Sequence, residues 1–215
     1  MHENSVAPHQ QRPRRGRPSR SHQKMQEIRQ NLIWTGVELL SQRGYVSTGL
    51  DDFLRQANIP KGSFYSLFSS KEAYGLEVLA AYASYFDRKL DRHLLADDKP
   101  PLTRLDNFMT DAKAGMARHA FLRGCVVGNL GQDVLSLPPS FRGALLIVLS
   151  GWEDRVAQCL IDAHRLGQIR ADADPRELAH VFWIGWEGAV LRSRLERDSK
   201  PLDSFRQYFL AAITA

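Results

Sequence analysis

Cysteine is scarce in this sequence: only Cys125 and Cys159 occur among 215 residues. Two cysteines are too few for the disulfide framework of a secreted protein, so we expect a reducing compartment. The sequence also has no apolar run of membrane-spanning length, and no signal-peptide core follows the basic N-terminus. These absences predict a cytoplasmic protein with no membrane partner.

Strand-like alternation and catalytic motifs are missing as well. Apolar residues recur at helical spacing almost throughout the chain, which predicts an all-α fold. The sequence has no paired His and Cys spacing typical of a metal site, no phosphate-binding loop and no nucleophile elbow. Its glycine-rich stretch at 124–131 does not follow a strand. We therefore expect no enzyme activity, no cofactor and no metal ion.

Basic charge is in excess only in the first third of the chain. Residues 1–70 contain 10 Lys and Arg against 5 Asp and Glu, whereas the rest of the chain contains 19 of each kind. The whole net charge of +5 thus lies in the N-terminal third, as in a DNA-reading unit attached to a neutral body. A basic tail that only aids solubility is the alternative interpretation.

Residues 1–20 are predicted to form a disordered basic arm, because they contain prolines and show no apolar periodicity. Within this arm, Arg15 and Arg17 flank a glycine, which is typical of a segment that enters the minor groove of A·T-rich DNA. A loose tail that contacts phosphates is equally compatible with such a short basic motif.

Residues 21–69 are predicted to form a helix-turn-helix domain, called the head below. Thr48 is expected to cap its second helix, with Asp51 completing a capping box. A turn at Asn58 separates this helix from a third one, which begins at Lys61. Two short helices joined by a tight turn are typical of a DNA-binding motif.

Residues 70–215 are predicted to form a helical body. Apolar stripes at helical spacing indicate long helices over 70–94, 140–166 and 175–197, a shorter one over 105–119, and a last helix after Pro201. The glycine-rich residues 121–132 are expected to form a short or irregular helix.

The head resembles the TetR family of bacterial transcriptional regulators. The residues that carry the resemblance are Gly44, Tyr45, Thr48, Asp51, Asp52, Phe53, Ala57, Lys61, Gly62, Ser63, Phe64, Tyr65, Phe68, Lys71 and Glu72. The sequence departs from the usual family pattern at Gly49 and Leu67. The resemblance implies a three-helix head on a helical body that binds a ligand and dimerises.

Two body segments resemble a narrower group within this family. The segments GMARHAFLRGCVVGNLGQD (115–133) and FWIGWEGAVLRSRLE (182–196) are similar to those of repressors that respond to acrylate or other small electrophilic, unsaturated molecules. This resemblance implies a homodimer that binds a palindromic double-stranded DNA operator and is released by a small effector.

The expected DNA contacts fall into two groups. The residues placed to bond phosphate oxygens are Thr48, Lys61, Tyr65 and Lys71. The residues expected to reach the major groove are Ser63, Phe64 and Ser66, with Gly62 allowing close backbone approach. For Phe64 the alternative is core packing, which we also expect for Phe68.

The expected ligand contacts lie in the body. They are Phe108, Met116, His119, Cys125, Asn129, Trp183, Glu187 and Arg192. For the aromatic residues and Met116, core packing is the alternative. His119 could instead favour the negative end of its helix, and Glu187 could form a salt bridge with Arg192 or another base at the edge of the bundle.

Cys125 carries the most specific hypothesis about the effector. It lies at an expected helix start near Arg118 and Arg123, and both surroundings lower the pKa of a thiol. Its thiolate could then react with electrophiles or oxidants. The alternatives are a small buried apolar residue, or reversible binding of a carboxylate by Arg118, Arg192 or Arg194. Arg194 stands where some relatives of the resembled group have a lysine near the sensing thiol.

The dimer seam is expected on the helix that carries Leu145 to Leu160 and on the one that carries Leu178 to Trp186. Gly185 and Gly188 in the second of these indicate close packing or approach of a ligand.

Two other functions compete with a ligand-responsive repressor. The first is an enzyme, but the sequence contains no catalytic motif. The second is a nonspecific DNA-coating protein, which would not need a neutral body.

Overall fold

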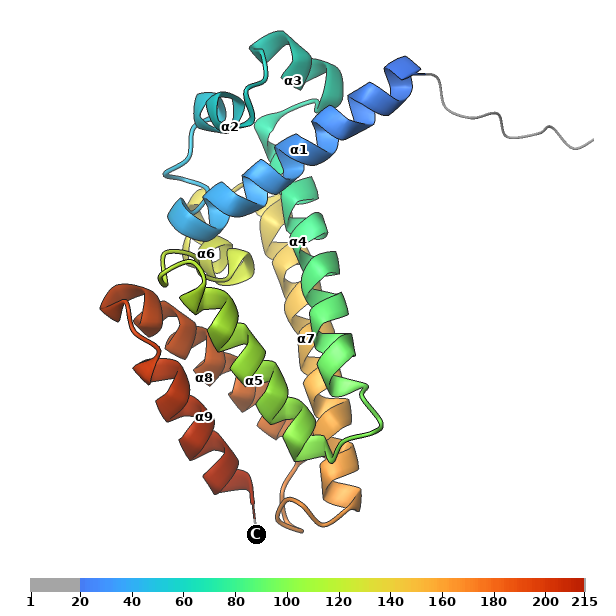
Figure 1. The fold of residues 1–215 in the computed structure, drawn as a ribbon, viewed down its shortest axis with the longest axis vertical. Helices are drawn as coiled ribbons and strands as arrows, with labels where there is room; N and C mark the ends of the chain where they lie inside the picture. The colour runs from blue at the N-terminus through green and yellow to red at the C-terminus, as the bar shows by residue number, and fades with distance from the viewer. Residues whose placement is uncertain (1–19, 215) are drawn as a thin grey trace, which may run out of the picture.

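The computed structural model describes residues 20–214, which form nine α-helices, one short 3-10 turn and no strand (Figure 1). The all-α prediction is confirmed. The elements are α1 (Arg20–Arg43), α2 (Leu50–Ala57), α3 (Lys61–Leu67), α4 (Lys71–Leu94), α5 (Pro101–Ala117), α6 (Val126–Gln132), η1 (Val134–Ser136), α7 (Pro139–Arg165), α8 (Pro175–Glu196) and α9 (Lys200–Ile213). The predicted contacts of Arg15 and Arg17 lie outside the described residues.

Aromatic side chains hold the head together. Phe53, Phe64 and Phe68 each pack against Tyr74 at the start of α4, with ring centroids 5.0–5.5 Å apart. The Tyr74 hydroxyl donates a hydrogen bond of 2.7 Å to the Leu32 carbonyl of α1. In Figure 1, α1 crosses the upper end of α4, and α2 and α3 lie on the far side of α1 from the body.

The start of α2 differs from the sequence-based prediction. Its N-cap is Gly49, whose backbone N–H donates to the Asp52 carboxylate at 2.9 Å. The Thr48 hydroxyl instead donates to the Gly44 carbonyl at 2.7 Å, so Thr48 closes the preceding turn. The predicted stop at Asn58 is confirmed, because this residue is left-handed with a φ of 55°.

The body is a bundle in which α4 runs down from the head and α5, α7, α8 and α9 pack beside it (Figure 1). Its centre is aromatic: Phe86, Trp152 and Trp183 lie against one another with centroids 4.4–6.1 Å apart. Gly185 on α8 makes room for α9, since a Cβ there would lie 2.2 Å from the Phe205 ring. Close packing is therefore the reason for this glycine.

The two helices on which we expect the dimer seam also contribute side chains to the core of this subunit. Leu145, Val156 and Leu160 of α7 and Phe182 and Trp186 of α8 belong to its own core. The seam on these two helices stays a prediction, and a second copy would have to meet their other, exposed sides, because periodicity alone does not say which side is covered within one chain.

Hydrogen bonds from the body reach the C-terminal part of α1. The Asn129 side-chain amide donates to the carbonyls of Leu40 and Ser41 at 2.7 and 3.1 Å. Arg194 of α8 donates to the Gln42 carbonyl at 2.8 Å. The carbonyl end of α1 is thus held by α6 and α8, which ties the orientation of the head to the body.

Among residues 20–214, no helix is both long enough and apolar enough to cross a membrane.

Candidate functional site

The outer surface of α3 presents small and polar side chains. Lys61 and Ser66 are exposed, Ser63 is half-buried, and Tyr65 is 57% exposed. A Cβ added at Gly62 would meet nothing within 4 Å, so the backbone here is open to close approach. A short helix with an open backbone and hydroxyl groups suits contact with a DNA groove.

Two predicted DNA contacts are contradicted by burial. Thr48 and Phe64 both have no exposed surface. The Thr48 hydroxyl is used by the Gly44 carbonyl, and the Phe64 ring lies 5.4 Å from that of Phe68. Neither side chain can reach DNA unless the head unfolds, and the core alternative for Phe64 is the correct one.

Lys71 is already engaged within the head. Its ammonium donates to the Tyr45 carbonyl at 3.3 Å and lies 4.2 Å from the centre of the Tyr45 ring. Burial lowers the pKa of Lys71. The Lys71 side chain is therefore not free. A phosphate contact from Lys71 would have to form alongside its interactions with Tyr45.

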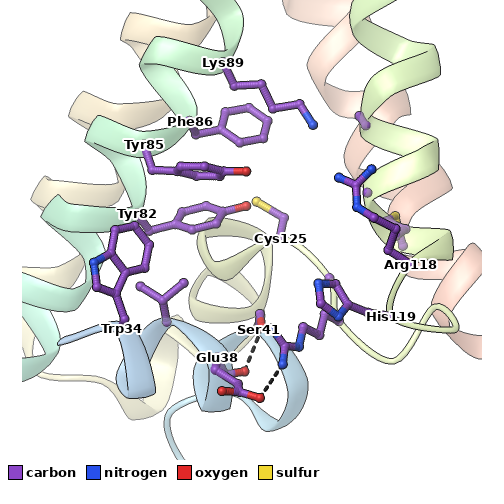
Figure 2. A pocket seen from close by; sticks show the side chains of 16 residues that line it. Trp34, Glu38, Ser41, Tyr82, Tyr85, Phe86, Lys89, Arg118, His119 and Cys125 are labelled. Carbon is purple, nitrogen blue, oxygen red and sulfur yellow. Dashed lines mark hydrogen bonds and ion pairs between the residues drawn. The ribbon is translucent and has the colours of Figure 1, made fainter. Parts of the chain in front are cut away.

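A cavity of about 430 Å³ lies directly below the head (Figure 2). It is bounded by α1, α4, α5 and the segment 118–125 that leads into α6. Its lining is Trp34, Val37, Glu38, Ser41, Tyr82, Tyr85, Phe86, Lys89, Ala112, Gly115, Met116, Arg118, His119, Arg123, Gly124 and Cys125. Three predicted ligand contacts, Met116, His119 and Cys125, are therefore brought together in one cavity.

The wall formed by α1 and α4 is aromatic, and the opposite wall is basic. Figure 2 shows Tyr82, Tyr85 and Phe86 along α4, facing Arg118 and His119 across the cavity. Trp34 of α1 meets Tyr85 edge to face at 6.0 Å. Such a cavity suits a small organic molecule with an apolar part and a negatively charged group.

The basic groups differ in how far they are already paired. Lys89 is only 7% exposed and its ammonium lies 3.0 Å from the Asp111 carboxylate. Burial lowers the pKa of Lys89, which Asp111 partly offsets. Arg123 is paired with Glu38. Arg118 has no carboxylate partner among residues 20–214, so its guanidinium is available to an anion.

Other predicted ligand contacts do not reach this cavity. Phe108 and Trp183 are core residues whose ring centroids lie 6.1 Å apart. Asn129 is buried, donates to α1 and accepts a hydrogen bond of 2.6 Å from Arg194. Arg192 is exposed and bonds to Glu196 at 2.6 Å, so the expected salt bridge to Glu187 does not form. Periodicity does not distinguish the inner side of a core helix from a cavity wall.

The pKa predicted for Cys125 is wrong in direction. Cys125 is the N-cap of α6 and its sulfur accepts from the Gly128 N–H at 3.5 Å, as expected for a helix start. Burial nevertheless raises the pKa of the thiol well above its usual value, and the nearby Glu187 raises it further. Burial and a neighbouring carboxylate therefore outweigh the helix terminus.

Sequence reasoning missed Trp34, Tyr82, Tyr85 and Lys89 as cavity residues. One feature of the sequence could have indicated Lys89. It lies one turn after Phe86 and two turns after Tyr82, so a lysine interrupts the apolar stripe of α4. A charged residue on the buried side of a helix usually has a partner or a ligand.

The comparisons with known proteins cover most of the chain and agree with one another. Residues 32–74 match the family model of bacterial regulatory proteins, tetR family, and residues 101–209 match that of the tetracyclin repressor-like, C-terminal domain. The transcriptional regulator AcuR of Cereibacter sphaeroides is 49% identical over 93% of this chain and 90% of that protein. The HTH-type transcriptional repressor DhaR of Mycobacterium sp. is 34% identical over 83% of this chain and 88% of that protein. The crystal structure of regulatory protein TetR from Rhodobacter sphaeroides superposes with a TM-score of 0.86 at 48% identity, covering 87% of this chain and 99% of that one.

Proposed function

The chain belongs to the TetR family of bacterial regulatory proteins, and on this basis we propose that it is a ligand-responsive transcriptional repressor. In this proposal it binds a palindromic operator as a homodimer in the cytoplasm and leaves the operator when a small effector binds to the body. Repression rather than activation is supported by DhaR, a relative that is named a repressor.

The observation that carries the proposal is the cavity against the head. Its aromatic wall and the unpaired Arg118 favour an effector with a short apolar part and a carboxylate. This chemistry agrees with the resemblance of segments 115–133 and 182–196 to acrylate-responsive repressors. Cys125 in the same lining supports the alternative effector class, an electrophile that modifies the thiol.

A physical route connects the cavity to the head. Cys125 caps the start of α6, and Asp133 follows its end. The Asp133 carboxylate accepts hydrogen bonds from the backbone N–H groups of Tyr45 and Val46 at 3.0 and 3.3 Å. A ligand that moves α6 would therefore move the segment that leads into α2, and so shift the equilibrium between DNA-competent and released states.

The dimer seam that we propose follows the exposed side of α8. Val181, Ile184 and Leu195 are 44%, 64% and 69% exposed at helical spacing. Gly188 lies between them, and a Cβ there would meet nothing within 4 Å. A second copy packed on this side would cover the apolar side chains and place two heads about 34 Å apart, the spacing of successive major grooves.

The DNA contacts that we propose are those compatible with burial. Lys61 and Tyr65 would bond phosphates, Ser63 and Ser66 would reach base edges, and Gly62 would permit close approach.

Release of a labelled operator tests the effector class. Acrylate, larger carboxylates and thiol-reactive electrophiles would each be titrated against the wild type, Arg118→Gln and Cys125→Ser. A carboxylate effector requires Arg118→Gln to weaken release by about tenfold or more, while Cys125→Ser keeps full release. The matched control is Arg142→Gln, an exposed arginine on α7 away from the cavity. No release by any compound would contradict the proposal.

A further inference from the structure

Three ionisable side chains interact with one another in series beside the cavity. Tyr82 of α4 interacts with the Cys125 sulfur, and the Cys125 sulfur interacts with the Glu187 carboxyl of α8. Figure 2 shows the Cys125 sulfur and the Tyr82 hydroxyl pointing toward one another at the cavity edge. Cys125 is therefore part of a cluster built from three helices.

Glu187 is unusual in this cluster because it has no basic partner in the described part of the chain, residues 20–214. Arg192 is bonded to Glu196, and Arg194 is bonded to Asn129 and the Gln42 carbonyl. The interaction that remains for the Glu187 carboxyl is with the Cys125 thiol. Glu187 is half-buried. Holding a carboxyl away from water without a cation is costly, so its position beside a thiol calls for an explanation.

Gly128 makes this position possible. A Cβ at residue 128 would lie 2.2 Å from a Glu187 carboxylate oxygen and 3.6 Å from the Cys125 Cβ. A larger residue would push the carboxyl away from the sulfur. The glycine in the first turn of α6 thus provides the space in which the thiol and the carboxyl meet.

The two sides of the Cys125 residue meet different surroundings. On one side Cys125 lines the large cavity, together with Tyr82. On the other side it lines a small pocket with Gly128, Glu187 and Arg194. A molecule in the cavity can therefore approach the sulfur while Glu187 stays on the side away from it.

We propose that Glu187 is the proton acceptor that enables Cys125 to add to an electron-poor alkene bound in the cavity. The inference rests on the proposed function, since it uses the effector cavity, and it adds a residue whose role is to take the thiol proton. Tyr82 is the positioning residue, because its hydroxyl points toward the sulfur at the cavity edge and would hold it there.

The reaction balances without an oxidant or another reagent. The S–H bond breaks as its proton passes to the Glu187 carboxylate, and the sulfur forms a bond with the β-carbon of the alkene. The π-electron pair moves toward the carbonyl as an enolate, whose α-carbon takes a proton from water in the cavity, and Glu187 releases its proton to water. The product is a thioether, and Glu187 is again a carboxylate.

The charge state of Glu187 supports this role near neutral pH. Burial raises the pKa of Glu187 to about 7, so its carboxylate form becomes dominant as the pH rises through neutrality. The other titratable or charged groups that face it are Cys125 from α6, Tyr82 from α4 and Arg194 from α8 itself. Because the thiol has a pKa well above its usual value, it would scarcely react at this pH without a base.

The test follows alkylation by acrylamide, a neutral electron-poor alkene that does not need a carboxylate site. The folded protein would be labelled at a series of pH values from acidic to alkaline. Peptide mass spectrometry would then give the labelling rates of Cys125 and Cys159 separately. For the wild type we expect the Cys125 rate to rise with an inflection near pH 7. In Glu187→Gln this inflection should vanish and the rate above pH 7 should fall on the order of 100-fold.

Two controls belong to the same experiment. Cys159 is a buried thiol that donates to the Pro101 carbonyl, so Glu187→Gln should leave its rate unchanged and thereby show that the fold is intact. Glu196→Gln removes an exposed α8 carboxylate and should change neither rate. An equal Cys125 rate and pH profile in the wild type and Glu187→Gln would overturn the inference.

Operator release distinguishes this failure from a failure of the proposed function. Release by a carboxylate together with unchanged Cys125 alkylation in Glu187→Gln would overturn only the role of Glu187. Alkylation that depends on Glu187 without release by any compound would support that role and contradict the effector-responsive repressor.

Discussion

At the residue scale, burial decides which side chains of the head can act on DNA. Phe64 and Tyr65 are neighbours in the sequence, yet Phe64 has no exposed surface and Tyr65 is 57% exposed. The same distinction separates Thr48, which closes a turn, from Lys61, which is exposed. Residue type alone suggested DNA contact for all four.

The pair Phe64 and Tyr65 gives a direct prediction. Phe64→Ala should lower the free energy of unfolding by about 3–5 kcal/mol, because it empties a position packed against Phe68 and Tyr74. Urea unfolding measures this loss. Tyr65→Ala is the matched variant, and it should keep the stability within about 1 kcal/mol while weakening operator binding. Equal stability losses in the two variants would contradict the burial argument.

Glu187 gives a second prediction at this scale, in the pH dependence of stability. Burial raises its pKa from 4.5 to about 7 in the fold, so the folded state keeps a proton that the unfolded state has released. Stability should therefore be lost as the pH rises from about 4.5 to about 7, by up to about 1.4 kcal/mol per pH unit. Glu187→Gln should lack this loss. The melting temperature of the variant minus that of the wild type should therefore be larger at pH 8 than at pH 4. Parallel melting curves across pH would contradict it.

At the scale of elements, α3 and α8 carry the two surfaces that the function needs. Both present an outer side that nothing among residues 20–214 covers: α3 an open backbone with hydroxyl groups, and α8 a row of apolar side chains. The first suits DNA, and the second suits a copy of itself.

A change at the start of α3 tests the phosphate role. Lys61→Ala should weaken binding to operator and to random DNA alike, and reduce the salt slope of the affinity by about one. Fluorescence anisotropy at several salt concentrations measures this slope. Lys99→Ala, at an exposed body lysine, should leave it unchanged. A loss confined to one operator sequence would instead indicate base contact.

A charge on α8 tests the seam. Ile184→Glu should shift the protein from dimer to monomer, since it would bury two carboxylates in an apolar contact. Analytical ultracentrifugation across concentrations reports the change. Leu135→Glu replaces an apolar residue of η1 that is 99% exposed and should leave the dimer intact. A dimer that survives Ile184→Glu would place the seam elsewhere.

At the scale of the whole molecule, the question is how the cavity affects the head. The bonds between them gather at the C-terminal part of α1 and the segment that follows it, where Asn129, Arg194 and Asp133 donate or accept. Two of these three residues belong to α6 or its C-terminal cap, and the cavity lies at the start of α6.

Asp133 tests this coupling. Asp133→Ala removes the acceptor for the N–H groups of Tyr45 and Val46, so the ratio of operator affinities without and with saturating effector should fall toward one. Titrations of operator with and without effector measure that ratio. Asp98→Ala, at an exposed residue between α4 and α5, should keep it. An unchanged ratio in Asp133→Ala would exclude this route.

The sequence by itself determined the all-α fold, the head and the turn at Asn58, because helical periodicity, capping and turn residues act over a few positions. It also indicated Met116, His119 and Cys125, which lie close together along the chain. The tertiary structure alone decided that Thr48 and Phe64 are buried, that Lys89 and Tyr82 line the cavity, and that burial, with Glu187, raises the pKa of Cys125. The physical reason is that burial and electrostatic surroundings depend on residues brought together from distant helices, which no local pattern records.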